Sequence, residues 1–576
     1  MDKEHLAKLG KIKDSLEVER QIYLSKWKEL APYLGISFSN WDNDSTNEQL
    51  ADTKPILDST ADEAGDLMAN GIQGYACGSN NPWLSLSFEN EKYQKSSVLG
   101  GALKASEDRI YKQFNKASFY DASLAMTLSV VHLATGIMWM EEDPKRGQPV
   151  YSVLHPRDCY IQENSAHEVD VLFREFWLTQ EEAMEQFGDS CSDSIRNGKD
   201  ATQKFQFVNY VAPRSRYGMR DQVQGEKNYI SVYWEVGKTD KTVKEEEYTR
   251  KPFAVWRFSR ALFGGAWGVD SPGMKKLSDI KQVNGLCDDR FRLSRLTARP
   301  YGKKTRGLKV NITPNGFTEL GPGEDYTVMR PTNDLSWTQA IIEDLQKKIR
   351  AAYYSDYFLI LSSTIEQRKT ATEANGLQEE KSVIMASFFS RMCSEFLEPV
   401  IEWTFMNEGI HGRLPEFSEA LSTSVAELRQ RKEEAGEVVE DEDKLLEEVT
   451  KDLGEVKVDF ISQLAKTQER ASKHQPNIAY ANQILALLQV FPEARYKIDI
   501  YNFIDDVAKN FGTNSKIVVP TSRAKRDYET VVKAQQEAAI AQARLNALQQ
   551  AGKAYKDFSS DIGENSAIGA MGGENA

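Results

Sequence analysis

Two stretches of helical pattern, 273–297 and 337–361, flank a short segment rich in turn residues. Ser271 places a capping hydroxyl before Pro272, which suits the first position of a helix, and Pro300 ends the first stretch. The pattern predicts a hairpin of two helices, each about 38 Å long at ~1.5 Å of rise per residue. A lone hairpin cannot bury its apolar faces, so we expect copies of the chain to pack side by side.

The segment between the two helices alternates short apolar runs with turn residues. The runs 310–312 and 326–329 predict strands, and the sequences Asn-Gly at 315–316 and Gly-Pro-Gly at 321–323 predict turns. We therefore expect a small module containing strands at the tip of the hairpin.

Two capping boxes mark further helix starts, because the two ends of this motif each satisfy an unpaired backbone N–H. The pairs are Ser336 with Gln339 and Thr370 with Glu373. The first opens the second helix of the hairpin. The second opens a long helix that runs to about Asn407, and Pro399 should kink it because proline removes a backbone donor.

A basic run lies where the first helix meets the tip. It contains no Asp or Glu, and its cations are Arg290, Arg292, Arg295, Arg299, Lys303, Lys304, Arg306 and Lys309. The chain as a whole has a formal charge of -14. A basic island in an acidic chain indicates a partner, either a phosphate backbone or an acidic protein surface. A solvated helix end and loop is the alternative.

Composition indicates a globular chain of several domains. Its 576 residues predict about three or four domains, and 40% hydrophobic residues can fill their cores. No apolar run approaches the ~18 residues of a membrane span. The first residues are charged and lack the apolar core of a signal peptide, so nothing indicates secretion. The five cysteines are scattered without a C-x-x-C pair, which predicts reduced thiols.

The remaining pattern predicts one α+β body over 1–270, with at least one sheet. Helices are expected at 4–33, 56–75, 92–114 and 119–133, and strands at 84–88, 136–140, 150–154, 170–178, 229–236 and 253–258. Further helices are expected at 475–488, 501–511 and 523–555, the last with an alanine-rich seam for helix packing. The charged stretch 420–450 predicts a solvated helical insertion, and 559–576 predicts disorder.

Catalytic motifs are missing from the sequence. The stretch around Gly237-Lys238-Thr239 lacks the first glycine of a phosphate loop, and His167-Glu168 lacks the second histidine of a zinc helix. Ser271 misses the spacing of a nucleophile elbow by one residue. We therefore expect no catalytic residue, no metal and no cofactor, and hence no enzyme.

Several phrases, taken in chain order, resemble a known family. They are Asp58-x8-Leu67, Asn81-Pro-Trp83-Leu-Ser-Leu, Gly264-Gly-Ala-Trp-Gly268, Ser271-Pro-Gly-x5-Asp279-Ile-Lys, Thr370-Ala-Thr-Glu373 with Glu379-Glu380, Phe396-Leu-Glu-Pro399 and Val458-Asp-Phe-Ile-Ser-Gln-Leu-Ala465. Their order and spacing resemble the portal, or head-to-tail connector, protein of short-tailed bacteriophages. The resemblance covers about 15–530 and is poorest at 420–455 and after 556.

The resemblance implies an α+β, predominantly helical chain with a portal-type fold. That fold has a wing, a helical-hairpin stem, a small α/β clip and a helical crown. By position, the parts are 1–272 wing, 273–297 first stem helix, 298–335 clip, 336–361 second stem helix, 362–369 tunnel loop, 370–409 long wing helix, 410–465 return to the wing with an acidic insertion, 466–556 crown with a possible barrel, and 557–576 disordered tail.

The function that the resemblance implies is a ring of about twelve copies at one capsid vertex. Its channel carries DNA during packaging and ejection. The implied partners are other copies of the chain, viral double-stranded DNA, the packaging terminase, a tail adaptor, and capsid and scaffolding proteins, with no membrane. The implied location is the virion, after synthesis in the host cytoplasm.

Two sets of residues follow as candidate sites. The tunnel loop would face DNA with Ser362, Ser363, Thr364, Gln367, Arg368 and Lys369, whose hydroxyls, amide and cations suit phosphate contact without sequence preference. The clip cluster of Arg299, Lys303, Lys304, Arg306 and Lys309 would contact the motor, the adaptor or DNA. For each residue, a solvated connector is the alternative.

Two other classes of function stay open. One is a different ring-forming virion or tail adaptor protein, although adaptors are usually shorter. The other is a DNA-processing enzyme, against which the missing motifs count. An ATPase assay would distinguish an enzyme from a structural protein. A negative-stain view down the ring axis would show the symmetry and the channel together.

Overall fold

The computed structural model describes most of the first 460 residues and one later helix. The described residues are 3–35, 41, 56–79, 82–89, 97–143, 145–198, 200–221, 227–238, 241–262, 264–311, 319–329, 335–362, 385–414, 417, 419–423, 425–426, 429, 456–460, 531, 533, 536 and 539–553. Contacts divide the chain into two units, Met1–Gln468 and Glu469–Ala576.

The first unit is built around helix α5 (Phe119–Leu133) and a three-stranded antiparallel sheet. Strand β2 (Thr135–Glu142) is the middle strand, between β3 (Pro149–Leu154) and β9 (Phe253–Arg257). α5 passes directly into β2 through Ala134, which has the left-handed φ of 65°. The apolar side chains of α5 and β2 lie in the main hydrophobic core, because both elements are covered on nearly every side.

A second sheet of five antiparallel strands follows the simple order β4-β5-β6-β7-β8. The strands are β4 (Cys159–Glu163), β5 (Val169–Thr179), β6 (Lys204–Pro213), β7 (Tyr229–Glu235) and β8 (Lys244–Tyr248). Alternating residues of β5 serve two cores: Val171 and Phe173 pack under helix α1 (Lys3–Leu30), whereas Phe176 and Leu178 pack beside helix α6 (Gln180–Phe187). The short helix α7 (Asp193–Arg196) adds Ile195 to the α6 side.

Helices α2 (Thr60–Ala76) and α4 (Ser97–Lys116) pack in the same main core. So do a π-helical turn at Met392–Leu397 and the helix α13 (Glu398–Ile410) that continues it. Strand β1 (Leu84–Phe88) pairs with β12 (Val456–Phe460), which joins two distant parts of the chain. Short 3-10 turns lie at Ala31–Tyr33, Pro156–Asp158, Gly188–Ser190 and Arg216–Asp221.

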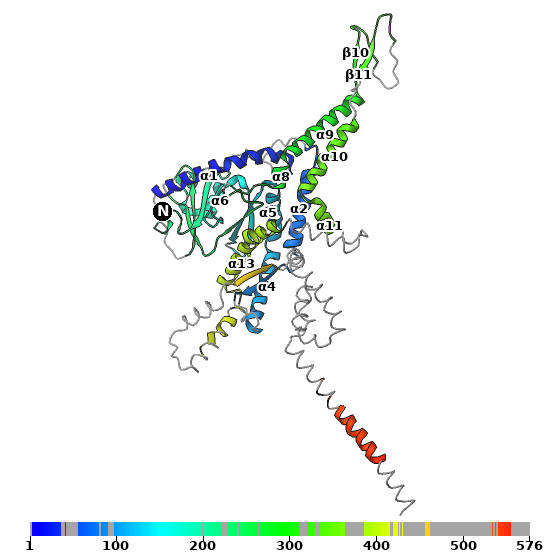
Figure 1. Cartoon of the computed structure of the whole chain (residues 1–576). Coiled ribbons are helices and arrows are strands. Elements are labelled where there is room, and N and C mark those ends of the chain that lie inside the picture. Colours follow the sequence, from blue (N-terminus) through cyan, green and yellow to red (C-terminus); the bar gives the residue numbers. More distant parts are fainter. Residues whose placement is uncertain are drawn as a thin grey trace, which may run out of the picture. The chain divides into compact units, whose positions relative to one another are not determined.

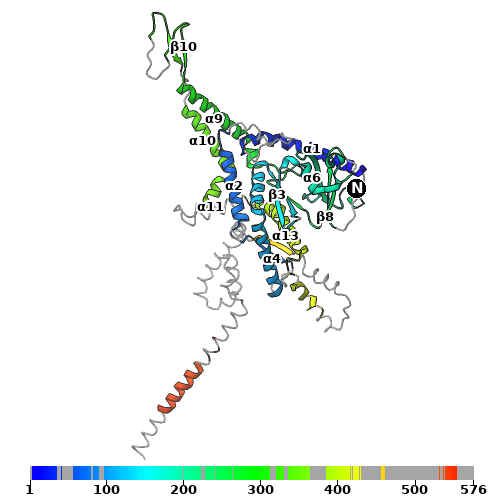
Figure 2. The same cartoon turned by 180° about the vertical axis from the view of Figure 1, so that it is seen from behind.

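The predicted hairpin is present, and the labels in Figures 1 and 2 allow it to be followed. Its outgoing arm is α8 (Pro272–Lys275) and α9 (Leu277–Ala298), and its returning arm is α10 (Leu335–Ala352) and α11 (Ser355–Ser362). Strands β10 (Tyr301–Lys304) and β11 (Tyr326–Met329) pair at the tip.

Three details of the predicted hairpin are wrong. Each arm is two helices rather than one, interrupted at Lys276 in the first arm and at Tyr353 and Tyr354 in the second. Tyr354 has a φ of 53°, which no regular helix accepts. The first tip strand is β10, whereas Val310 and the residue after it lie in no strand.

The predicted body over 1–270 is confirmed as mixed helix and sheet. The helix at 119–133 has the predicted bounds, and the single helix α1 covers most of 4–33. The helix expected at 56–75 begins only at Thr60. Sequence patterns missed β4, β6 and β8, since their polar residues interrupt the apolar alternation.

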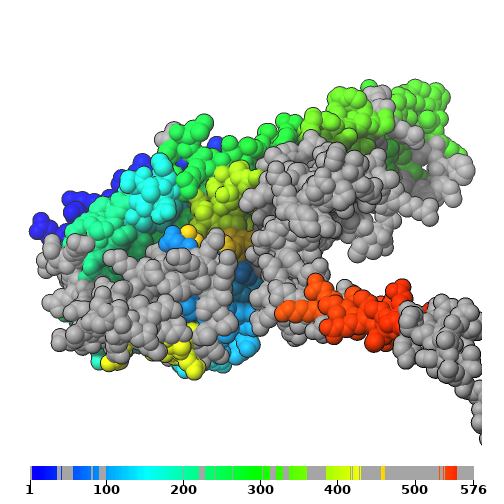
Figure 3. All heavy atoms as spheres, turned by 60° about the horizontal axis from the view of Figure 1, so that its bottom comes forward, coloured from blue at the N-terminus to red at the C-terminus, as the bar shows by residue number. Residues whose placement is uncertain are grey.

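Pro399 stands in the first turn of α13, immediately after the π-helical turn, and a kink at this proline stays a prediction. The box at Thr370 and Glu373, the helices expected at 475–488 and 501–511, and most of 420–450 lie outside the described residues. In the second unit, the helix at 539–553 is exposed on all sides, and Figure 3 shows it in red. Among the described residues, no helix combines the length and apolar character that crossing a membrane requires.

Candidate functional site

The base of the hairpin is fixed at the C-terminal end of α5. Ser271 caps α8 by accepting from the Met274 amide (3.2 Å) and donates its own hydroxyl to the carbonyl oxygen of His132 (2.7 Å). The predicted cap is therefore confirmed. A Cβ on Gly273 would lie 2.9 Å from the same carbonyl oxygen, so only glycine allows α8 to approach α5 this closely.

The returning arm meets the same residue. The His132 Nδ1 and the Tyr353 hydroxyl form a hydrogen bond of 3.0 Å, and both side chains are fully buried. Burial lowers the pKa of His132 to about 3, so the imidazole is neutral at physiological pH. The backbone and side chain of one residue of α5 thus hold both arms of the hairpin.

A neighbouring phrase, Gly264-Gly-Ala-Trp-Gly268, also packs at this end of α5. Trp267 lies edge-on to Trp27 with ring centroids 5.1 Å apart, and the Trp27 indole donates to the Leu133 carbonyl (2.9 Å). The Gly268 amide donates to the Thr135 hydroxyl (2.9 Å), and a Cβ there would lie 2.0 Å from the Ala134 carbonyl oxygen. These contacts explain why a tryptophan stands at 267 and a glycine at 268.

The inner half of the hairpin is part of the main core. Its buried apolar residues are Ile280, Val283 and Cys287 on α9 and Ile342, Leu345 and Ile349 on α10. Asn284 is buried beside them and accepts from the amides of Leu57 and Asp58 at 3.1 and 3.2 Å. The Asp58 carboxylate in turn accepts from Gln346 (2.5 Å). The hairpin is therefore anchored to the segment that precedes α2.

The outer half of the hairpin lacks such cover. Trp337 on α10 is 70% exposed and Phe291 on α9 is 51% exposed, with the Arg295 guanidinium 4.2 Å from the Phe291 ring centroid. Arg290 donates to the Gln339 side chain (2.6 Å), which itself donates to Glu343 (2.7 Å). The capping box predicted for Gln339 is therefore wrong: α10 already includes Leu335, and Gln339 bridges the arms instead.

The five predicted clip cations lie close together in the chain, and all are exposed. Arg299 ends α9, Lys303 and Lys304 are on β10, and Arg306 and Lys309 follow it. Pairing with β11 changes their surroundings, because the backbones of Thr305 and Asp325 are hydrogen bonded (3.0 Å) and Glu324 precedes this pair. The basic run is thus folded against acidic residues that lie some twenty positions later in the sequence.

The predicted tunnel loop is largely outside the described residues. Ser362 is the last residue of α11. Ser363, Thr364, Gln367, Arg368 and Lys369 are not among the residues that the structure describes, and their contact with DNA stays a prediction.

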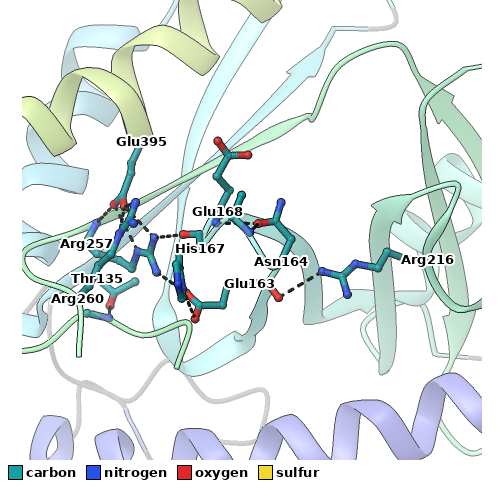
Figure 4. A network of polar contacts seen from close by, with 11 residues as sticks. Thr135, Glu163, Asn164, His167, Glu168, Arg216, Arg257, Arg260 and Glu395 are labelled. Atoms are coloured by element: carbon teal, nitrogen blue, oxygen red, sulfur yellow. Dashed lines mark hydrogen bonds and ion pairs between the residues drawn. The ribbon is translucent and has the colours of Figure 1, made fainter. Parts of the chain in front are cut away.

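An arginine network that the sequence analysis did not predict lies where β9 meets the π-helical turn (Figure 4). The Glu395 carboxylate accepts from the Arg257 amide (2.9 Å) and guanidinium (2.8 Å) and from Arg260 (2.9 Å). Arg257 is 1% exposed and also donates to Glu163 (3.0 Å) and to the His167 carbonyl (2.7 Å). The only sequence signal is an arginine ending a wholly buried strand, which requires a partner.

A cavity of about 350 Å³ opens beside this network. Its wall includes Glu168 and Glu398, and burial raises the pKa of Glu398, with Glu402 and Glu168 adding repulsion. Figure 4 shows Glu168 directed away from the arginines. Among the described residues, no group of three or more His, Cys, Asp or Glu side chains could hold a metal ion.

Comparisons with known proteins agree with the resemblance seen in the sequence. The probable portal protein of Bordetella phage BPP-1 is 24% identical over 524 residues, which are 88% of this chain and 87% of that protein. The portal protein of Salmonella phage epsilon15 is 24% identical over 578 residues, 96% of each.

One solved structure, the virion of a native gene transfer agent particle, contains a chain with a TM-score of 0.28 and 12% identity, over 68% of this chain and 91% of that one. The model of the bacteriophage head to tail connecting protein family matches residues 6–518. This protein therefore belongs to the bacteriophage head-to-tail connecting protein family.

Proposed function

We propose that the chain is the portal protein of a phage. About twelve copies form a ring at one capsid vertex, and the channel of the ring carries DNA during packaging and ejection. Family membership and the names of the two phage relatives support this function. The observation that carries it is the hairpin, whose inner half is anchored in the core while its outer half keeps large apolar side chains exposed.

The exposed side chains of the hairpin are the proposed ring interface. Trp337 and Phe291 lie on different arms, and large aromatic residues in water indicate a surface that another molecule covers. Identical hairpins set around an axis would bury them against the next copy, and such a head-to-tail contact closes into a ring when the rotation between copies fits.

The acidic character of the chain suits a channel for DNA. Each phosphate that a protein neutralises adds salt-dependent affinity, which would retard a moving duplex. A net charge of -14 allows hydrated DNA to slide, with contact limited to a few cations such as Arg368 and Lys369. The chain acts in this proposal as a structural component of the virion, without catalysis of its own.

The tip of the hairpin is the proposed docking site for the packaging terminase and the tail adaptor. Its five cations are exposed, and the described tip also carries Glu319, Glu324 and Asp325. A surface with both signs of charge fits recognition of a protein better than uniform attraction to phosphate. Capsid and scaffolding proteins would contact the first unit outside the hairpin.

Assembly of the purified chain tests the proposal. We expect native mass measurement and negative-stain images to show closed rings with a central channel. Trp337→Asp combined with Phe291→Asp should prevent ring formation, because two charges would be buried at each interface. Val18→Asp, at a residue 74% exposed on α1, is the matched control and should assemble normally. Wild-type chain that stays monomeric or dimeric at all concentrations and salts would contradict the proposal.

A further inference from the structure

A second cavity, of about 460 Å³, lies between α1 and the β4 side of the five-stranded sheet. It begins where the apolar contacts between α1 and the sheet end, since Leu16 is still in that core and the next inward residue is Arg20. The cavity is separate from the hairpin and from the arginine network around Glu395.

Arg20 forms the floor of this cavity and is 5% exposed. One guanidinium nitrogen donates to the carbonyl oxygens of Arg157 and Cys159, the latter at 3.0 Å. The guanidinium lies over the Tyr160 ring, 4.0 Å from its centroid. Its Nε has no hydrogen-bond partner, and no carboxylate among the described residues is within ion-pair distance of Arg20. A buried arginine without a carboxylate is uncommon, because burial of an unpaired charge is costly.

The carboxylates that line the cavity already have partners. Glu175 binds Lys13 and accepts from the Tyr160 hydroxyl (3.0 Å). Asp158 pairs with Arg157 (2.8 Å), and Glu17 lies 3.9 Å from Lys13. Arg20 is therefore a buried cation of the cavity that no described carboxylate neutralises.

Charged residues form most of the wall, and three aromatic side chains interrupt them. Trp41 and Tyr160 are buried, whereas Trp177 at the opening is 43% exposed. Tyr, Trp and Arg are the residues enriched at the energetic centres of protein interfaces, where a small pocket excludes water around a polar contact. A free anion does not require such walls, but a side chain with an apolar stem does.

We propose that this cavity is a docking pocket for an acidic side chain of a partner protein. The carboxylate binds the planar guanidinium of Arg20 through two parallel hydrogen bonds, and the stem packs against Trp177 and Tyr160. The proposal does not depend on ring formation, because every residue of the pocket belongs to one copy of the chain. The competing explanation is that Arg20 only stabilises the 3-10 turn at Pro156–Asp158, whose carbonyls it binds.

Binding of labelled, acetylated tetraglutamate to the full chain tests the pocket by fluorescence anisotropy. We expect saturable binding that weakens as salt rises, and none with tetraglutamine. Trp177→Ala should weaken binding at least tenfold without loss of folding, since this side chain is half exposed. Arg20→Lys should do the same, because lysine lacks the planar fork. Ile22→Ala, on the same helix but 64% exposed and outside the cavity, is the control and should bind as the wild type.

Three outcomes would overturn the proposal. They are no saturable binding of tetraglutamate, unchanged binding by Trp177→Ala, and displacement of the peptide by inorganic phosphate at an equal concentration, which would identify a site for small anions instead. If Arg20→Lys does not fold, as circular dichroism would show, Trp177→Ala decides alone.

Discussion

At the scale of single residues, Glu395 carries an unusual share of the polar contacts. It accepts hydrogen bonds from two arginines and a backbone amide. It belongs to the π-helical turn that packs against β9. π-Turns are less regular than α-helices and require local contacts to persist. We infer that the Arg257–Glu395 pair holds this turn in place.

Replacement of Glu395 by Ala should lower the free energy of unfolding by roughly 3 kcal/mol or more, because Arg257 would stay buried with only part of its charge compensated. Denaturant titration measures the change. Glu29→Ala, which removes an ion pair of similar length (2.9 Å) with the exposed Lys281, should have little effect. Equal losses for both variants would show that the buried network has no special weight.

His132 predicts a pH dependence of stability. Its pKa is about 3 in the folded chain and about 6.5 when unfolded, so below the higher value the unfolded chain binds a proton that the folded chain does not. This residue therefore reduces stability as pH falls from about 6.5 towards 3, by roughly 1 kcal/mol per pH unit. His132→Gln should lose this contribution and depend less steeply on pH than the wild type, which denaturant titrations between about pH 6 and pH 4 would show. Tyr353→Phe keeps the imidazole and should retain the slope.

At the scale of elements, the hairpin arms are divided where they enter the core. Both arms contact α5, through Ser271 and Tyr353, and each arm is interrupted close to this contact, at Lys276 and at Tyr353 and Tyr354. Beyond them, α9 and α10 pack on each other, and the outer half keeps the large aromatic side chains Phe291 and Trp337 exposed. The proposed function thus assigns ring assembly to the outer half of the hairpin and docking of partners to its tip.

Substitution of Arg299, Lys303, Lys304 and Arg306 by Ala should leave ring assembly intact and weaken binding to the terminase or the adaptor. The four side chains are exposed at the tip, away from the anchored half of the hairpin, and exposed charges mainly affect encounter. Pull-down with purified partners and ring images of the same sample measure the two properties. Loss of rings in this variant would assign the cations to assembly.

At the scale of the whole molecule, the proposed ring and its channel require several copies of the chain. The proposed loop at 362–369 would be repeated in every copy around the duplex, so a charge change at one position is multiplied by the number of copies. Its two cations, Arg368 and Lys369, are the residues proposed to contact the phosphate backbone.

Arg368→Glu with Lys369→Glu should permit assembly into proheads and impair packaging or retention of DNA. Reversed charges repel the phosphate backbone, and salt screens this repulsion over ~8 Å at physiological ionic strength, so the defect should ease as salt rises. Packaging assays on proheads that contain the variant measure the effect. Normal packaging at low salt would mean that the loop does not meet DNA. Ser362→Ala, which changes no charge, is the control.

The sequence by itself determined the features that depend on neighbours along the chain. The cap at Ser271, the helix α5 and the hairpin could be predicted because capping, periodicity and turn residues act within a few positions, whereas the first strand of the tip was predicted at the wrong residues. The family could also be predicted from the sequence, since it was recognised from the order and spacing of several short motifs. The interruption at Tyr354 was not predicted, because no glycine or proline marks it; its left-handed backbone follows Tyr353, which is hydrogen bonded to the distant His132.

The tertiary structure alone decided which distant residues meet. Glu395 lies 138 positions from Arg257. Asp325 is brought beside the basic run, and the Arg20 guanidinium is placed over the Tyr160 ring with no carboxylate partner among the described residues. None of these pairs shares a local pattern, and burial depends on how the sheets and helices stack rather than on any one segment. The base of the hairpin, the arginine network and the proposed docking pocket are therefore properties of the fold, whereas the hairpin itself is already a property of the sequence.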